Sequence, residues 1–164
     1  MTESLPALGA DQRYRRIEAQ FYEPFTFGKN TWVPRLAAGL TLEGDLPLSD
    51  RFMLGGFLNL SGFARRGLYD RNALLGQLIY YRQIATLPPG FGSGIYAGFS
   101  LEAGNVWADP GGIRVRDLIY GGSVFLGADT LLGPLHFGIG YAEGGETAIY
   151  LQLAPSLRRD RFSR

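Results

Sequence analysis

The chain has 164 residues, 46% of them apolar, and its 16 basic and 15 acidic side chains leave a formal net charge of +1. This balance excludes the strongly basic surface that nucleic-acid-binding proteins use, so we expect no nucleic-acid partner. The chain has no cysteine and a single histidine, which excludes thiolate and multi-histidine metal sites, and we expect neither a cofactor nor enzymatic activity.

The N-terminal residues 1–10 lack the basic region and the apolar core of a secretory signal, and we expect them to be disordered. No window of about 18 apolar residues predicts a membrane helix. The 24 glycines, 11 phenylalanines and 9 tyrosines favour strands over helices. We therefore expect an all-β domain over residues 11–157, followed by a basic tail at 158–164.

Seven stretches alternate apolar side chains with small or polar ones, which predicts strands with one apolar face. The stretch at 31–43 is about twelve residues long, so its length favours a tilted membrane strand over an ordinary strand of about five or six residues. Pro34 lacks an N–H, and we expect it near the first turn of this strand. The other stretches lie at 14–22, 73–84, 95–105, 118–129, 135–142 and 148–153.

The second face of these strands carries mostly glycine, serine, threonine and tyrosine, where a soluble sheet would be heavily charged. We therefore expect the apolar face to contact lipid, and a soluble β-barrel that binds an apolar ligand is the alternative. The phase of the strand at 73–84 stays open because both of its faces carry leucine or isoleucine. Five polar side chains are predicted to face the lumen: Arg35, Glu43, Glu102, Asp129 and His136. They either have a specific functional role or only tune hydration and packing inside the barrel.

The connections differ in length. Short ones at 88–93 and 131–134 and long ones at 44–71 and 106–117 are typical of barrels with short periplasmic turns and long outer loops, although the connection at 143–146 is short. Aromatic side chains near strand ends are expected to contribute to an interfacial girdle; they are Trp107, Tyr120 and Tyr141.

A glycine-rich run occupies residues 52–63. Gly55 and Gly56 allow a close backbone approach, and the apolar Leu60 and Phe63 disfavour a freely solvated loop. We expect this loop to fold back into the protein. A plain strand with a bulge at the glycine pair is the alternative.

Four segments carry a resemblance to a known family. They are Phe-x-Leu-Gly-Gly at 52–56 followed by Ser-Gly-Phe at 61–63, Tyr-Tyr-Arg at 80–82, Leu-Glu-Ala-Gly-Asn-Val-Trp at 101–107 and Gly-Pro-Leu at 133–135. Over residues 30–155 the chain resembles the C-terminal part of the bacterial surface antigen domain, the barrel of the outer-membrane assembly and two-partner secretion superfamily. It looks most like the barrel attached to patatin-like phospholipase autotransporters.

This resemblance implies a bacterial outer-membrane barrel of about sixteen strands, whose sixth extracellular loop enters the lumen with a Val-Arg-Gly-Phe/Tyr motif. Five strands follow that loop in the family, as they do here. The motif falls on residues 60–63, so Ser61 stands where the family has arginine. The lumenal loop that the resemblance implies includes Gly55, Gly56, Leu60, Ser61, Gly62 and Phe63.

The implied function is a barrel segment that anchors, displays or helps export an attached patatin-like lipase. An assembly or secretion translocon is the alternative, and the missing arginine disfavours it. The chain contains no POTRA-like region and no patatin Gly-x-Ser-x-Gly motif. Seven strands leave two open edges, which hydrocarbon does not tolerate. We therefore expect a fragment or truncated product whose partners are the lipid bilayer and either upstream barrel strands or copies of the chain itself.

Overall fold

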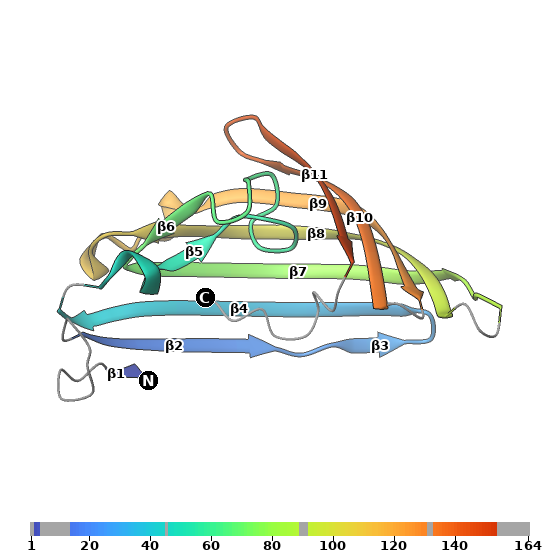
Figure 1. The fold of residues 1–164 in the computed structure, drawn as a ribbon, viewed down its shortest axis with the longest axis horizontal. Helices are drawn as coiled ribbons and strands as arrows, with labels where there is room; N and C mark the ends of the chain where they lie inside the picture. The colour runs from blue at the N-terminus through green and yellow to red at the C-terminus, as the bar shows by residue number, and fades with distance from the viewer. Residues whose placement is uncertain (1, 4–13, 45, 89–91, 131–132, 154–164) are drawn as a thin grey trace.

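The alternating stretches form the long strands of one curved antiparallel sheet (Figure 1). The computed structural model describes residues 2–3, 14–44, 46–88, 92–130 and 133–153. Its strand order is β1-β2-β4-β7-β8-β9-β10-β11, with β3 also paired to β4 and with β5 and β6 forming a separate hairpin. The bounds are β1 Thr2–Glu3, β2 Arg15–Tyr22, β3 Phe25–Phe27, β4 Asn30–Glu43, β5 Phe52–Leu54, β6 Leu68–Asp70, β7 Asn72–Ala85, β8 Gly92–Trp107, β9 Ile119–Thr130, β10 Gly133–Ala142 and β11 Glu146–Leu153.

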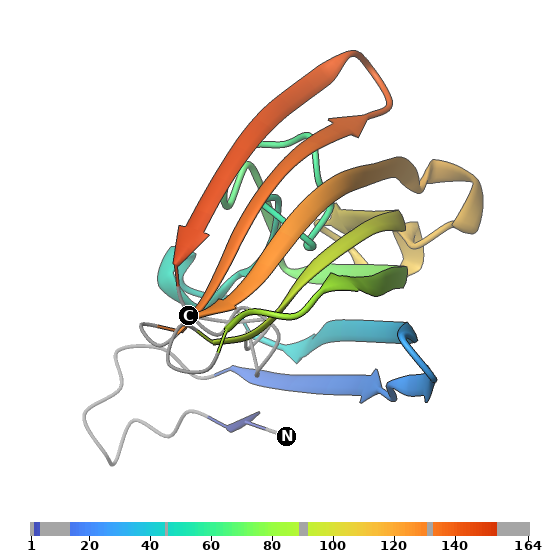
Figure 2. The ribbon, with the colours of Figure 1, turned by 90° about the vertical axis from the view of Figure 1, so that its right-hand side faces the viewer.

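The sheet confirms the predicted all-β class and has the form of a partial β-barrel, with a strand at each of the seven expected stretches. Figure 2 shows the sheet curving so that one face is concave. Within the described residues, β11 forms one outer edge of the sheet, and at the other edge the short β1 pairs with two residues of β2. Thr2–Glu3 is the one described part of the segment 1–10, and the tail at 158–164 lies outside the described residues.

The phase of β7, which its sequence leaves open, is fixed by burial. Leu75, Gln77 and Ile79 face the concave side with 0%, 6% and 2% of their surface exposed, whereas Leu78 points outward. The concave side of this strand carries Leu75 and Ile79 because another part of the chain covers them, as described below.

Pro34 lies inside β4 and not in its first turn. It stands opposite the interruption between β2 and β3, where its carbonyl accepts a 3.3 Å hydrogen bond from the Glu23 N–H. The two flanking registers, Tyr22 with Arg35 and Phe25 with Trp32, are continuous across this interruption. Pro34 lacks an N–H, but the sheet loses no strand-to-strand hydrogen bond, because the neighbouring chain is not in a strand between β2 and β3.

The connections divide the sheet into two ends. The turn end carries the short turn at 28–29 and the connections that join β7 to β8 and β9 to β10; the loop end carries the segments at 44–71, 108–118 and 143–145. Short 3-10 helices lie at the loop end: η2 Leu48–Asp50, η3 Pro110–Gly112 and η4 Val115–Asp117. No helix within the described residues has the length and apolar character needed to cross a membrane.

Candidate functional site: a loop held against the concave face

The segment between β5 and β6, residues 55–67, folds onto the concave face of the sheet and is called the inner loop here (Figures 1 and 2). Leu60 and Ser61 are fully buried, and Phe57 and Leu58 are 5% and 6% exposed. Because β5 ends at Leu54 and the chain then leaves the hairpin, the glycine pair does not form a bulge within a continuous strand.

Glycine is required where the inner loop turns back on itself. Gly55 has a φ of 110°, and a Cβ there would lie 2.4 Å from the Ala64 carbonyl oxygen. The Gly55 N–H donates to the Asn59 carbonyl at 2.7 Å, and the Asn59 N–H donates to the Gly56 carbonyl at 3.1 Å. The first part of the loop is thus closed by its own backbone.

Ser61 attaches the middle of the inner loop to β8 through Glu102. Its N–H donates to Oε2 of Glu102 at 2.7 Å, and its hydroxyl donates to Oε1 at 2.8 Å. The Ser61 oxygen also accepts the Leu58 N–H at 3.1 Å. Glu102 is 3% exposed, and its Oε1 receives a further hydrogen bond from Ser100, whose hydroxyl contacts that of Ser123 at 2.7 Å. The carboxyl group therefore organises a buried polar cluster beneath the loop.

Glycines on β9 and β10 provide the space that the inner loop occupies. A Cβ on Gly140 would lie 2.7 Å from the Ser61 Cβ, and one on Gly138 would lie 2.8 Å from the Phe57 ring. A Cβ on Gly121 would lie 2.8 Å from the Ser61 carbonyl oxygen. The small residues of the concave face thus form a groove that fits the loop backbone.

Tyr150 attaches the loop to β11, the edge strand. Its hydroxyl accepts the Gly62 N–H at 3.0 Å and donates to the Phe63 carbonyl at 2.9 Å. Its ring packs against Phe57, with 5.5 Å between the ring centroids. The sequence analysis did not single out Tyr150, although its alternation with Ile149 and Leu151 in the stretch at 148–153 indicates an inward side chain. A hydroxyl-bearing ring on an otherwise small-residue face was the available signal.

Arg35 approaches the inner loop from β4. Its guanidinium donates to the Leu58 carbonyl at 3.4 Å, and the Gln20 amide, oriented with its oxygen toward Arg35, accepts two further bonds at 3.1 Å. Arg35 is in register with Gln77, which is in turn in register with Glu102. These side chains form a polar row across β4, β7 and β8, directly under the loop.

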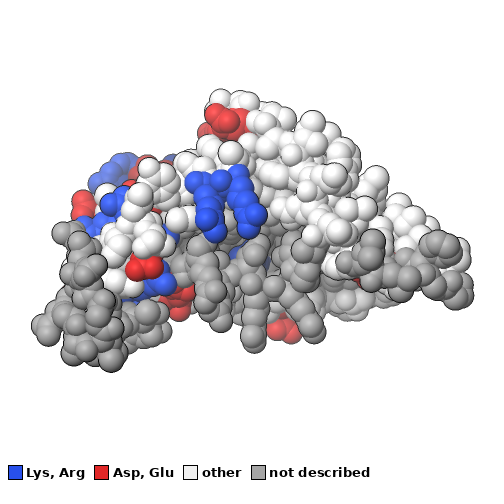
Figure 3. All heavy atoms as spheres, viewed as in Figure 1, with Lys and Arg blue, Asp and Glu red and all other residues white. Residues whose placement is uncertain are grey.

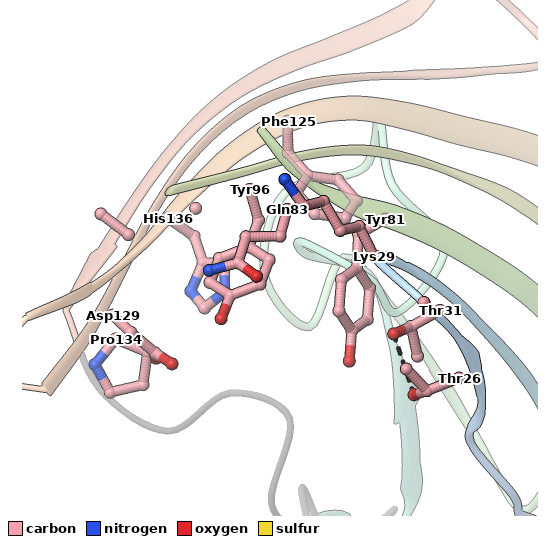
Figure 4. Close-up of a pocket in the computed structure, with 13 residues that line it drawn as sticks. Thr26, Lys29, Thr31, Tyr81, Gln83, Tyr96, Phe125, Asp129, Pro134 and His136 are labelled. Carbon is pink, nitrogen blue, oxygen red and sulfur yellow. Dashed lines mark hydrogen bonds between the residues drawn. The ribbon is translucent and has the colours of Figure 1, made fainter. Parts of the chain in front are cut away.

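Of the remaining predicted polar residues, His136 also contacts the inner loop, with its ring centroid 5.9 Å from that of Phe57, whereas Asp129 and Glu43 lie at the two ends of the sheet. Asp129 and His136 line a cavity of about 430 Å³ at the turn end, together with Lys29, Tyr81 and Gln83 (Figure 4). Asp129 accepts a hydrogen bond from Ser93 at 2.8 Å, and His136 is 7% exposed. Glu43 lies at the loop end of β4, exposed and 3.9 Å from Arg15. Within the described residues, no three His, Asp or Glu side chains are grouped so that they could hold a metal ion.

Charge is distributed unevenly over the concave side. Figure 3 shows basic and acidic side chains gathered at the loop end and near the inner loop, whereas the white surface visible on the right of the view carries few charged side chains. Arg65 and Arg66, in the last part of the inner loop, are exposed. The loop therefore buries its middle and presents basic groups on its surface.

The comparisons with known proteins identify the family of the chain. The family model of the Omp85 superfamily domain matches residues 1–148. No curated protein matches the chain. The chain therefore belongs to the Omp85 superfamily of outer-membrane β-barrel proteins, whose members act in protein assembly and secretion.

Proposed function

We propose that this chain forms part of the wall of a transmembrane barrel in the bacterial outer membrane, and that this barrel anchors, displays or helps export an attached passenger. The passenger proposed is a patatin-like lipase, and its support is the sequence resemblance. The inner loop is proposed to lie in the barrel lumen, at the extracellular end. The observation that carries the membrane part of this proposal is the two-sided character of the sheet.

Large apolar side chains cover the convex face. Leu101, Val124 and Leu151 on β8, β9 and β11 are 59%, 62% and 74% exposed. Serine, glutamate, histidine and glycine occupy the opposite face, where Ser100, Ser123 and Glu102 are buried. A soluble barrel that binds an apolar ligand would have the reverse arrangement, with its apolar face inside, so this alternative is disfavoured.

The strand lengths fit a bilayer. The outward residues of β4 run from Trp32 to Leu42, and ten steps of roughly 3.3 Å along a strand tilted by about 40° rise about 25 Å. This rise equals the usual height of the apolar band on an outer-membrane barrel. Aromatic rings lie near both ends of the strands. At the turn end, the ring centroids of Trp32 and Tyr80 are 4.6 Å apart. At the loop end, Tyr120 and Tyr141 are exposed. These rings support the proposed girdle.

Ser61 favours a barrel that carries an attached partner over one that inserts other proteins. The superfamily resemblance places an arginine at this position, and here a neutral serine makes the contact with the wall. The second candidate function, an assembly or secretion translocon, is supported by superfamily membership and by the cavity beside Asp129 and His136 at the proposed periplasmic end.

The orientation of the wall can be tested with single cysteines, because the chain contains none. In membranes from cells that make the full-length protein, Leu101→Cys should react with a lipid-soluble maleimide and resist a water-soluble one. Val115→Cys, in the exposed helix η4, should react with both and serves as the control. Equal reaction of both positions with the water-soluble reagent, or recovery of native protein without detergent, would refute a lipid-facing wall.

Deleting the gene distinguishes the two candidate functions. Loss of a surface lipase activity, with normal amounts of the other outer-membrane barrels, is the result expected for a passenger-carrying barrel. A general fall in the amounts of other barrels would instead identify an assembly factor and contradict the passenger proposal.

A further inference from the structure

The cavity at the turn end of the concave face has the size of a ligand site. Its volume of about 430 Å³ lies within the range of roughly 300–1,000 Å³ that is usual for pockets that bind small molecules. Its lining comes from β3, β4 and the turn between them, and from β7, β8, β9 and β10. Figure 4 shows side chains from these segments gathered around a common space. The cavity is therefore formed by the interior strands of the sheet.

Aromatic rings line much of this cavity. The rings of Tyr81 and Tyr96 stand almost perpendicular to each other, with their centroids 5.9 Å apart and an interplanar angle of 84°. The ring of Phe125 follows, with its centroid 6.5 Å from that of His136. Gly98 makes room for two of the rings, because a Cβ there would lie 2.6 Å from the Phe125 ring and 2.8 Å from the Tyr81 Cβ. The cavity thus offers aromatic surface whose position the backbone determines.

Polar groups without protein partners border these rings. Within the described residues, the hydroxyls of Tyr81 and Tyr96 and the side-chain amide of Gln83 make no hydrogen bond to another protein group. Figure 4 draws a single hydrogen bond among the lining side chains, between Thr26 and Thr31 at 3.0 Å. Hydroxyl and amide groups both donate and accept, so these groups can pair with a ligand that does the same.

The formal charges at the cavity balance. Lys29, in the turn between β3 and β4, and Asp129, on β9, are the two lining residues with an ordinary formal charge, and both are exposed. A site for phosphate would gather several basic groups, and a site for a divalent cation would gather several carboxylates. One charge of each sign favours an uncharged ligand, to which the ammonium donates and the carboxylate accepts hydrogen bonds.

We infer that this cavity binds a sugar ring, as a free saccharide or as a unit of a glycan chain. A pyranose has an apolar face of C–H groups, which packs on the rings of Tyr81 and Tyr96. Its rim carries hydroxyls that each donate one hydrogen bond and accept others, and Gln83, Lys29 and Asp129 match that rim. Sugar binding does not depend on whether the barrel carries a passenger, so the two proposals stand or fall separately.

The test is isothermal titration calorimetry on the purified full-length protein. An amine-oxide detergent is used, because glucoside and maltoside detergents have sugar headgroups of their own. The probes are maltose and N,N′-diacetylchitobiose, which represent unsubstituted and N-acetylated glycans, and a glycine–tyrosine–glycine tripeptide, which represents a polypeptide in the lumen. Saturable binding of a disaccharide and none of the tripeptide is expected, and the preferred disaccharide identifies the kind of glycan. Binding of the tripeptide as tightly as the better disaccharide, or no binding of either disaccharide up to about 10 mM, would overturn the inference.

Variants of one tyrosine locate the binding. Tyr96→Phe keeps the ring and loses the hydroxyl, and should weaken disaccharide binding by about two- to tenfold, the factor for one hydrogen bond. Tyr96→Leu also loses the ring and should weaken it by about two- to tenfold more. Tyr69→Leu, at an exposed position of β6 at the loop end, is the matched control and should bind like the parent protein. Each variant is first shown to be folded by its band on semi-native gels. Equal affinities in the Tyr96 and Tyr69 variants would show that the sugar does not bind in this cavity.

Discussion

Ser61 gives both of its donors to one side chain: its N–H and its hydroxyl bind the two carboxyl oxygens of Glu102, at 2.7 and 2.8 Å. Both residues are buried, and they are 41 positions apart in the chain. Because buried donors and acceptors are costly to leave unpaired, the two residues determine each other's positions. The inner loop is thereby fixed to the wall by a neutral donor.

Glu102→Ala is expected to release the inner loop. It leaves the Ser61 N–H and hydroxyl without their acceptor, at a cost of roughly 1–3 kcal/mol for each buried group. Trypsin cleavage after Arg65 or Arg66, which are exposed at the end of the loop, should become faster. Glu146→Ala, at an exposed position, is the control. Identical cleavage rates in the two variants would show that the carboxyl group does not hold the loop.

Gly62→Ala is expected to destabilise the protein more than Gly144→Ala does. Both glycines have positive φ, 109° and 97°, so alanine is strained at either site. Only at Gly62 would the new Cβ also meet the wall, 2.4 Å from the Ala142 nitrogen, whereas nothing lies within 4 Å at Gly144. The additional cost is about 1–3 kcal/mol. The temperature at which the folded band disappears on semi-native gels measures the difference, and equal temperatures would contradict the docking of Gly62.

Gly140→Ala tests the groove on the wall. A methyl group there would lie 2.7 Å from Ser61 and 2.8 Å from the Gly62 nitrogen, so the loop must shift. Gly76→Ala, on β7, has its nearest atom at 3.9 Å and is the matched control. Faster trypsin cleavage of the loop is expected in the first variant and not in the second. If both variants resisted trypsin as well as the parent protein does, Gly140 would not provide space that the inner loop needs.

Leu101→Arg tests the convex face. A charge near the middle of a lipid-facing strand costs about 2–4 kcal/mol. Val115→Arg, at an exposed position outside the strands, should change stability by less than about 0.5 kcal/mol. The amounts of folded protein in the outer membrane should therefore differ clearly. If both variants reached the membrane in parental amounts, Leu101 would not face hydrocarbon.

The period-two pattern was sufficient to predict the long strands, because the convex face is mostly apolar and the concave face is mostly small or polar. It failed to fix the phase of β7 for a physical reason. Leu75 lies on the concave side because the hairpin and the inner loop cover it, in a cluster with Phe52, Leu54 and Leu60. Phe125 is a bulky side chain on the otherwise small-residue inner face of β9. The inner loop covers it too, because its ring centroid lies 5.5 Å from that of Phe57.

The partners of the inner loop could not be predicted from the sequence. Gly138 and Gly140 were visible as inward small residues, but their role depends on a loop that is about 80 residues earlier in the chain. Tyr150 was equally visible, yet its two hydrogen bonds depend on the loop's final position. Local periodicity reports which way a side chain points and carries no information on which distant segment meets it.

Amide hydrogen exchange in the membrane-embedded, full-length protein tests most directly whether the inner loop is held inside. The amides of Ser61 and Gly62 donate to Glu102 and Tyr150, whereas Gly144 lies in an exposed turn. We predict that peptides covering 58–63 exchange roughly a hundredfold more slowly than those covering 143–145, the factor for about 2.7 kcal/mol of protection. Exchange of the two segments at the same rate would contradict a docked inner loop.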